Sequence, residues 1–132
     1  KTRMGRGGVV EDILYEDITA VGTARVFNFN MDAFSTTWLP EEFRAQPAPE
    51  QGTPTFRNIV VRNLRATDCE SAGRIIGLAE TPLRNLRLEN VSIEARRGFV
   101  IENTVALQFE NVKLNGKTVT ASSFQALNKA ER

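Results

Sequence analysis

The sequence lacks several residue types, and each absence excludes a class of site. It contains no histidine, which excludes Ser-His-Asp and Cys-His nucleophilic sites and every histidine metal site. Its one cysteine, Cys69, leaves no second thiol for an internal disulfide. No apolar run reaches the length of a membrane span and no signal peptide is visible, so no membrane contact is predicted. The net charge of +1 gives no electrostatic reason to expect nucleic acid as a partner.

The feature that is present is an eight-residue pattern that returns four times within a chain of single-domain length. Its copies are EDILYEDI (11–18), RNIVVRNL (57–64), RNLRLENV (84–91) and VALQFENV (105–112). Apolar residues alternate with polar ones, which is the period of a β-strand with one buried face. The step from the second apolar residue of each copy to the third is three residues instead of two, which predicts a bend in the strand at that point.

The predicted bends fall at Asp17, Asn63, Asn90 and Asn111. Asparagine and aspartate tolerate the left-handed backbone of such bends. If the copies stack in register, their side chains form a column in which amides bond to one another. We expect Asp17 to weaken the head of this column, because an ionised carboxylate donates no hydrogen bond.

The spacing of these four residues predicts the fold. The last two intervals, 63 to 90 and 90 to 111, match one solenoid coil each. A second apolar stretch follows three of the copies and predicts a second parallel strand per coil, at residues 25–29, 74–78 and 98–101. We therefore predict an all-β fold, a right-handed single-stranded parallel β-helix of which 1–132 forms the C-terminal coils. An antiparallel sandwich and a leucine-rich repeat fit the repeated bend less well.

Two segments depart from the repeat. The interval from 17 to 63 is longer by about one coil, and its excess, 35–53, holds three of the five prolines. It is interpreted as a long loop, with an irregular extra coil as the alternative.

The tail, 117–132, is expected to cover the last coil, with a short helix in 122–132 whose N-cap is Ser122 or Ser123.

The opening KTRMGRGGVVEDILYEDI and the later stretches TPTFRNIVVRNLRAT, IIGLAETPLRNLRLENVSI and ALQFENVKLNG resemble the C-terminal half of the polygalacturonase family, glycoside hydrolase family 28. Lys1 and Thr2 match the last residues of that family's Arg-Ile-Lys-Thr motif, whose arginine would precede Lys1. The resemblance covers the chain from Lys1 to about Gly116. It implies inverting hydrolysis of pectin by aspartates in N-T-D and D-D motifs, neither of which occurs here.

The resemblance also implies substrate contacts. Lys1 would bind the carboxylate of a galacturonate unit, and Arg6 would reinforce that anionic subsite or lie in a turn facing water. Phe34 matches a cleft tyrosine of the family and would stack on a sugar ring or pack in the core. The expected partner is pectic polysaccharide, no cofactor or metal is expected, and the parent protein would be secreted or periplasmic.

Alternatives to the enzyme fragment remain open at this point. No acid/base pair of carboxylates stands out, and Glu41, Glu42, Asp68 and Glu70 are interpreted as surface groups. The chain alone is therefore predicted to be inactive, with a non-catalytic carbohydrate-binding or structural β-solenoid as the alternative. The first coil is expected to self-associate or fray, because no covering segment precedes its strand edge.

Overall fold

The computed structural model describes residues 8–31 and 54–124, and it shows an all-β protein with a single sheet. No helix in these two ranges is long and apolar enough to cross a membrane. The strands are β1 (Val9–Val21), β2 (Arg25–Asn30), β3 (Thr55–Ile76), β4 (Leu83–Glu102), β5 (Thr104–Val105), β6 (Gln108–Leu114) and β7 (Lys117–Val119).

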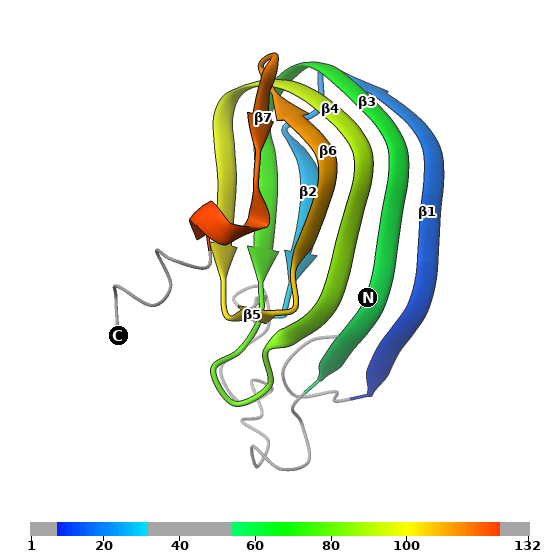
Figure 1. The fold of residues 1–132 in the computed structure, drawn as a ribbon, viewed down its shortest axis with the longest axis vertical. Helices are drawn as coiled ribbons and strands as arrows, with labels where there is room; N and C mark the ends of the chain where they lie inside the picture. The colour runs from blue at the N-terminus through cyan, green and yellow to red at the C-terminus, as the bar shows by residue number, and fades with distance from the viewer. Residues whose placement is uncertain (1–7, 32–53, 125–132) are drawn as a thin grey trace, which may run out of the picture.

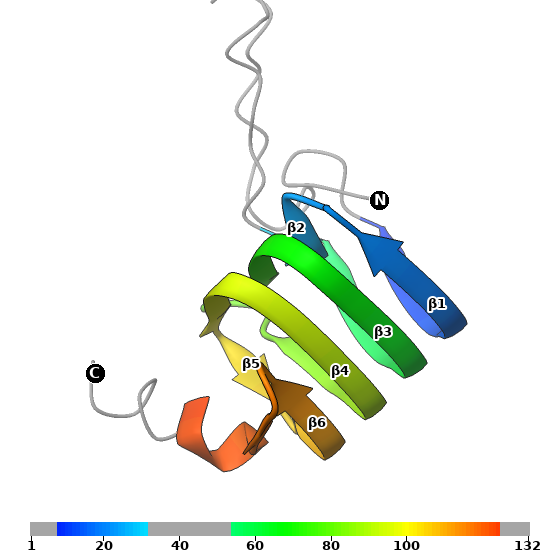
Figure 2. The same cartoon turned by 90° about the horizontal axis from the view of Figure 1, so that it is seen from above.

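The strands are arranged as four stacked layers (Figures 1 and 2). The first layer is β1 with β2, the second is β3, the third is β4, and the fourth is β5 with β6. Each layer pairs in parallel with the next, and Ile59 aligns with Leu86 in the register that the repeat predicts. The predicted parallel pairing of the four copies is therefore confirmed.

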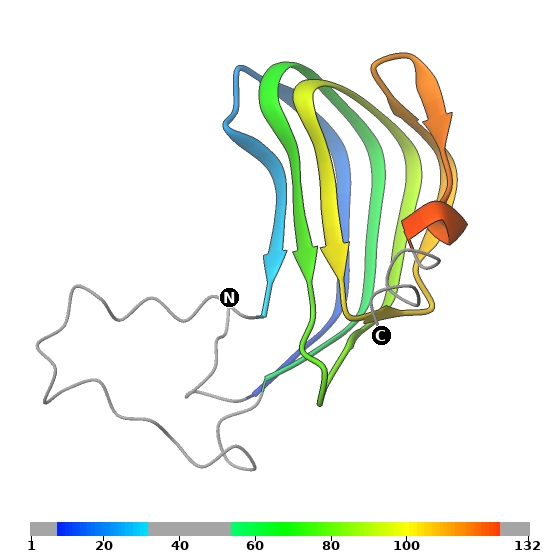
Figure 3. The same cartoon turned by 90° about the vertical axis from the view of Figure 1, so that its left-hand side faces the viewer.

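The second apolar stretches also pair in parallel and form a second side of the stack. Phe27 of β2 aligns with Gly73 of β3, which aligns with Phe99 of β4. Figure 3 shows these three segments side by side, opposite the longer side formed by the repeat copies. The expected parallel pairing of these second stretches is therefore confirmed. In the second and third layers the two stretches belong to one continuous strand, β3 or β4, which runs through both sides. A register shift between Ala66 and Cys69 accommodates the turn there.

Residues in the left-handed backbone conformation produce the bends. Asp17, Asn63, Asn90 and Asn111 all have φ between 52° and 57°, as the sequence predicts. A second set lies five residues earlier in each copy and consists of Asp12, Asn58, Asn85 and Ala106. Each copy therefore bends twice, and the first of these bends was not predicted.

The side chains of the bends form two hydrogen-bonded columns on the outer surface. In the predicted column, Nδ2 of Asn111 donates to Oδ1 of Asn90 at 3.0 Å. Asn90 donates to Asn63 at 2.9 Å, and Asn63 donates to Oδ1 of Asp17 at 3.1 Å. Every amide thus donates toward the N-terminal layer. Asp17 accepts at the head of the column, where no donor is needed, and a weaker column at this position stays a prediction.

The second column has the same direction. Nδ2 of Asn85 donates to Oδ1 of Asn58 at 2.8 Å, and Asn58 donates to Oδ1 of Asp12 at 3.3 Å. Ala106 occupies the matching position of the fourth layer without an amide to extend the column. Both columns therefore begin with a carboxylate in the first layer.

The core lies between the two sides of the stack, and inward residues align as columns through the layers. Ile59, Val61, Leu86, Leu88 and Leu107 are at most 5% exposed, as the alternating pattern predicts. Phe109, which was expected in the same core, is half-buried. Gly73 has no side chain because the backbone of Phe27 lies directly over it, and a Cβ would overlap the Phe27 carbonyl.

The C-terminal end of the stack is covered. β7 turns back and pairs antiparallel with the last three residues of β6, 112–114, which covers that part of the edge of the last layer. A helical turn at 121–124 follows, and the Phe124 ring lies 6.0 Å from the rings of Phe99 and Phe109. The predicted cap begins with a strand, and its helical turn starts one residue before Ser122. Oγ of Ser123 donates to the Thr120 carbonyl, so Thr120 marks the entry to this turn.

Several expectations lie outside the described residues. The proposed long loop at 35–53 is one of them, so the choice between a loop and an extra coil stays a prediction. The rest of the predicted helix, beyond residue 124, is another.

Candidate functional site

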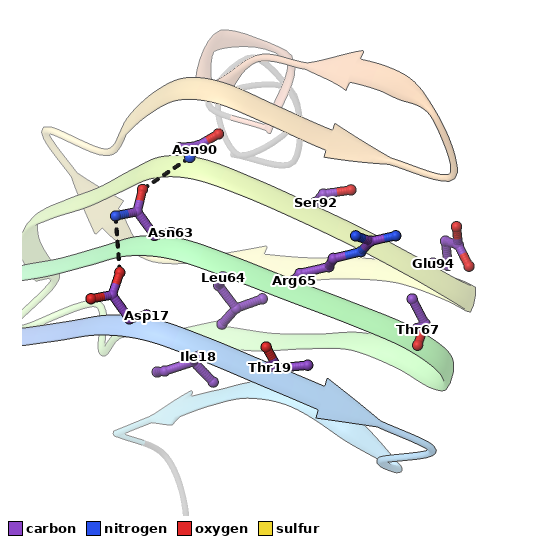
Figure 4. Close-up of a pocket in the computed structure, with 10 residues that line it drawn as sticks. All are labelled: Asp17, Ile18, Thr19, Asn63, Leu64, Arg65, Thr67, Asn90, Ser92 and Glu94. Carbon is purple, nitrogen blue, oxygen red and sulfur yellow. Dashed lines mark hydrogen bonds between the residues drawn. The ribbon is translucent and has the colours of Figure 1, made fainter.

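The strongest candidate site lies on the outer surface, beside the column of Asp17, Asn63 and Asn90. Residues two positions after each of these bends point outward and align in register: Thr19 with Arg65, and Arg65 with Ser92. Neighbouring layers of a sheet are about 4.8 Å apart, so these three side chains form a short row across β1, β3 and β4. Figure 4 shows this row.

The row forms the floor of a shallow hollow of about 530 Å³. The bend residues border one side, and Thr67 and Glu94 border the other. In Figure 4 the Arg65 side chain reaches from β3 toward β4, where Ser92 and Glu94 lie. The hollow therefore combines one cation, three hydroxyls and two carboxylates, those of Asp17 and Glu94.

Arg65 is distinguished by its lack of a carboxylate partner. Five other arginines form six ion pairs on the surface. These pairs are Arg57–Glu11, Arg62–Glu89, Arg87–Glu89, Arg87–Glu110, Arg96–Asp68 and Arg97–Glu70. With the residues in 8–31 and 54–124, the side chain of Arg65 forms neither an ion pair nor a hydrogen bond, and the side chains of Arg25, Arg74 and Arg84 share this property. Arg65 is the one of these four that lines the hollow.

The chemistry of the hollow follows from these groups. A guanidinium presents a planar fork of donors that matches a carboxylate. The hydroxyls of Thr19, Thr67 and Ser92 both donate and accept hydrogen bonds. The carboxylates of Asp17 and Glu94 only accept, and they disfavour a bare anion. A ligand that carries a carboxylate together with several hydroxyl groups complements all of them.

Five carboxylates elsewhere on the described surface act as ion-pair partners: Glu11, Asp68, Glu70, Glu89 and Glu110. Asp68 and Glu70, interpreted as surface groups, are 75% and 58% exposed and pair with Arg96 and Arg97. Glu89 and Glu110 both contact Arg87. The hydrogen bond to Glu110, followed by the charge of Glu89, raises the pKa of Arg87 above its ordinary value. These carboxylates hold cations and are not arranged as an acid and a base around a sugar.

Metal and thiol chemistry find no support in the part of the chain that the structure describes. No group of three or more His, Cys, Asp or Glu side chains within it could hold a metal ion. The thiol of Cys69 is buried, where it donates to the Thr67 carbonyl and accepts from the Thr23 hydroxyl. Cys69 is therefore a core residue.

The three site residues predicted from the sequence, Lys1, Arg6 and Phe34, lie outside the described residues, and their roles stay predictions. Sequence reasoning missed Arg65, although a signal for it exists. The alternation of RNIVVRNLRAT continues past the second bend, and it places Arg65 at an outward position next to Asn63. An eight-residue repeat ends one position too early to include it.

Comparisons of the chain with protein-family models, with curated proteins and with solved structures found no significant match.

Proposed function

We propose that this chain forms the last coils of a right-handed parallel β-helix that belongs to a polygalacturonase-like hydrolase of pectin. The layered parallel pairing, the two columns of Asp and Asn residues and the covered C-terminal end support this architecture. The catalytic aspartates of such an enzyme would lie upstream of residue 1. Pectin is an extracellular polymer, so a secreted or periplasmic location fits the proposal.

The observation that carries the substrate class is the unpaired Arg65 in a hollow lined by hydroxyls and carboxylates. A galacturonate unit has one carboxylate, which would meet the guanidinium, and ring hydroxyls, which would donate to Asp17 and Glu94. The exposure of the hollow limits each hydrogen bond to a modest net contribution. The proposal therefore assigns Arg65 to a weak contact with pectic polysaccharide, away from the bond that is cut.

A non-catalytic carbohydrate-binding module is the second candidate. It is favoured by the placement of the described carboxylates, of which Glu11, Asp68, Glu70, Glu89 and Glu110 hold arginines. Such a module would use the Arg65 hollow in the same way. The two candidates differ in whether a longer chain that contains this one hydrolyses pectin.

A binding experiment tests the substrate class. Oligogalacturonate titrated into the ¹⁵N-labelled chain should shift the amide signals of Thr19, Arg65 and Ser92, whereas the matching neutral galactose oligomer should shift them less. R65A should remove at least about 80% of the shifts at saturating ligand, because Arg65 is the one cation among the described residues that line the hollow. R74A is the matched control, since Arg74 is also unpaired but lies on the opposite side of the stack.

The outcomes separate the candidates. Equal effects of R65A and R74A, or equal binding of the neutral oligomer, would reject a uronate site at Arg65. The chain alone is predicted to release no reducing ends from polygalacturonate, because the N-T-D and D-D motifs that carry the catalytic aspartates of the family do not occur in its sequence. Hydrolysis above a buffer control by the purified chain would contradict the proposal that the catalytic aspartates lie outside this chain.

A further inference from the structure

The row of Thr19, Arg65 and Ser92 continues beyond the hollow onto the last layer of the stack. Ser92 of β4 aligns with Lys113 of β6, in the same parallel pairing that places β6 next to β4 in Figure 1. Lys113 lies between two residues of β6 that face the core, so the alternation of the strand directs its side chain outward. The row therefore has four members, one from each layer.

Lys113 resembles Arg65 in having no partner for its charge. Its side chain is exposed, and it forms neither an ion pair nor a hydrogen bond with the residues in 8–31 and 54–124. On the other side of β6 it aligns with Thr118 of β7, which adds a hydroxyl and no carboxylate. The ammonium group of Lys113 is therefore free, within the part of the chain that the structure describes, to bind an anion.

The chemical character of the outer surface alternates with the layers. The second and fourth layers each supply one of the two cations of the row. The first and third layers each supply a hydroxyl and, beside it, a carboxylate: Thr19 with Asp17, and Ser92 with Glu94. A further anion placed over the first or third layer would meet like charge, which is unfavourable. The row therefore fits a ligand that presents its negative charges to every second layer.

The spacing of the two cations fits a polysaccharide that runs along the stack. Neighbouring layers are about 4.8 Å apart, so the positions of Arg65 and Lys113 are separated by about 10 Å. One unit of an extended sugar chain has a length close to one layer spacing, so every second unit lies over a cation. The unit between them lies over the third layer, where its ring hydroxyls donate to Glu94 and accept from Ser92.

We propose that Lys113 is a second uronate-binding residue, and that Arg65 and Lys113 together bind the carboxylates of alternate units in a galacturonan chain that runs along the stack. The role of Lys113 rests on the proposed function, because it extends the Arg65 site. It adds the direction of the bound chain and a minimum length of three units. It also adds tolerance for a methyl ester on the middle unit, whose carboxyl group meets no cation.

Two oligomers of different length test the second cation. Digalacturonate and trigalacturonate are titrated into the ¹⁵N-labelled chain, and affinities are taken from the amide signals of Thr19 and Arg65. The dimer covers adjacent layers and reaches one cation, whereas the trimer reaches both. The trimer should bind at least about fourfold more tightly, because an exposed charge contact adds a modest contribution.

The variant K113A should remove this preference. The ratio of the two affinities should fall below about twofold, while the affinity of the dimer for the Arg65 site stays unchanged. K117A is the matched control, because Lys117 is an exposed lysine of the same hairpin that aligns with Leu114 and lies outside the row. K117A should keep the full preference for the trimer.

Methyl esters on single units of the trimer test the alternation of layers. An ester on the middle unit should change the affinity by less than about twofold, since that carboxyl group faces neither cation. An ester on either end unit should lower the affinity to about that of the dimer, since one of the two charge contacts is lost.

The outcomes distinguish the role of Lys113 from the Arg65 site itself. An unchanged trimer preference in K113A, or equal affinities of dimer and trimer while R65A weakens both, would overturn the role of Lys113 and leave the Arg65 site intact. A loss from the middle ester as large as that from an end ester would likewise overturn the binding of alternate units. Binding of neither oligomer, or binding that R65A does not weaken, would reject both proposals.

Discussion

The two ends of the stack are built from the same repeat and differ in how they finish. The column of Ile18, Leu64, Val91 and Val112 passes through all four layers. Val112, in the last layer, pairs with Val119 of β7 and is fully buried, whereas Ile18, in the first, is only half-buried. The difference teaches that the repeat builds layers, and that a separate, non-repeated segment is needed to close an end.

The largest difference is expected in the core. Leu86 is fully buried in the third layer, and L86A should lower the free energy of unfolding by roughly 2–5 kcal/mol. Ile13 belongs to the same column but lies in the open first layer, so I13A should cost about 1 kcal/mol or less. Urea unfolding of both variants measures this, and equal losses would mean that the two layers are equally well packed.

The cap itself should contribute a smaller, measurable share. F124A removes a ring that packs against Phe99 and Phe109, and we expect a loss of about 1.5 kcal/mol. Y15A at the open end is the matched variant. Tyr15 contacts one ring and is 42% exposed, so its loss should be under about 0.7 kcal/mol. A larger effect for Y15A in thermal or urea unfolding would contradict the comparison.

The unfinished second column allows a gain of stability in the last layer. Ala106 has a φ of 57°, which is costly for alanine. A106G should stabilise the fold by a few tenths of a kcal/mol to about 1 kcal/mol by removing that cost. A106N should do at least as well, because it also allows a hydrogen bond to Asn85. Destabilisation by both variants would show that the bend at Ala106 is set by other contacts.

The smallest effects are expected from the ion pairs at the two ends. E11Q breaks the contact to Arg57 in the first layer, and E110Q breaks the contact to Arg87 in the last. All four side chains are well exposed, so each variant should change stability by less than about 0.5 kcal/mol. A loss above 1 kcal/mol for either one in urea unfolding would mean that charge, and not packing, separates the two ends.

The sequence was sufficient to predict the parallel pairing and the main column. The reason is physical. In each copy the spacing between apolar residues changes from two to three at an Asn or Asp, and few backbone conformations allow this change. The first bend of each copy was missed because its residues were counted as the strand's polar face, although Asp12, Asn58 and Asn85 repeat as regularly as Asp17, Asn63 and Asn90.

Other features depended on contacts that no single copy of the repeat contains. The antiparallel return of β7 follows from the turn at Asn115 and Gly116, which lies outside the repeat. That the Arg65 side chain has no carboxylate partner among the described residues can be recognised only once the ion pairs of the other arginines are known. The direction of the amide columns, which makes Asp17 a suitable head, likewise requires the assembled stack.

Hydrogen exchange tests the central claim, that β1 is an open edge and the inner layers are closed, most directly. In a sample that sediments as a monomer, the amides of residues 13–18 should exchange at least about 100-fold faster than those of residues 86–91, because the first layer opens locally while the third opens only with the whole stack. Equally slow exchange of both segments in the monomer would contradict the account.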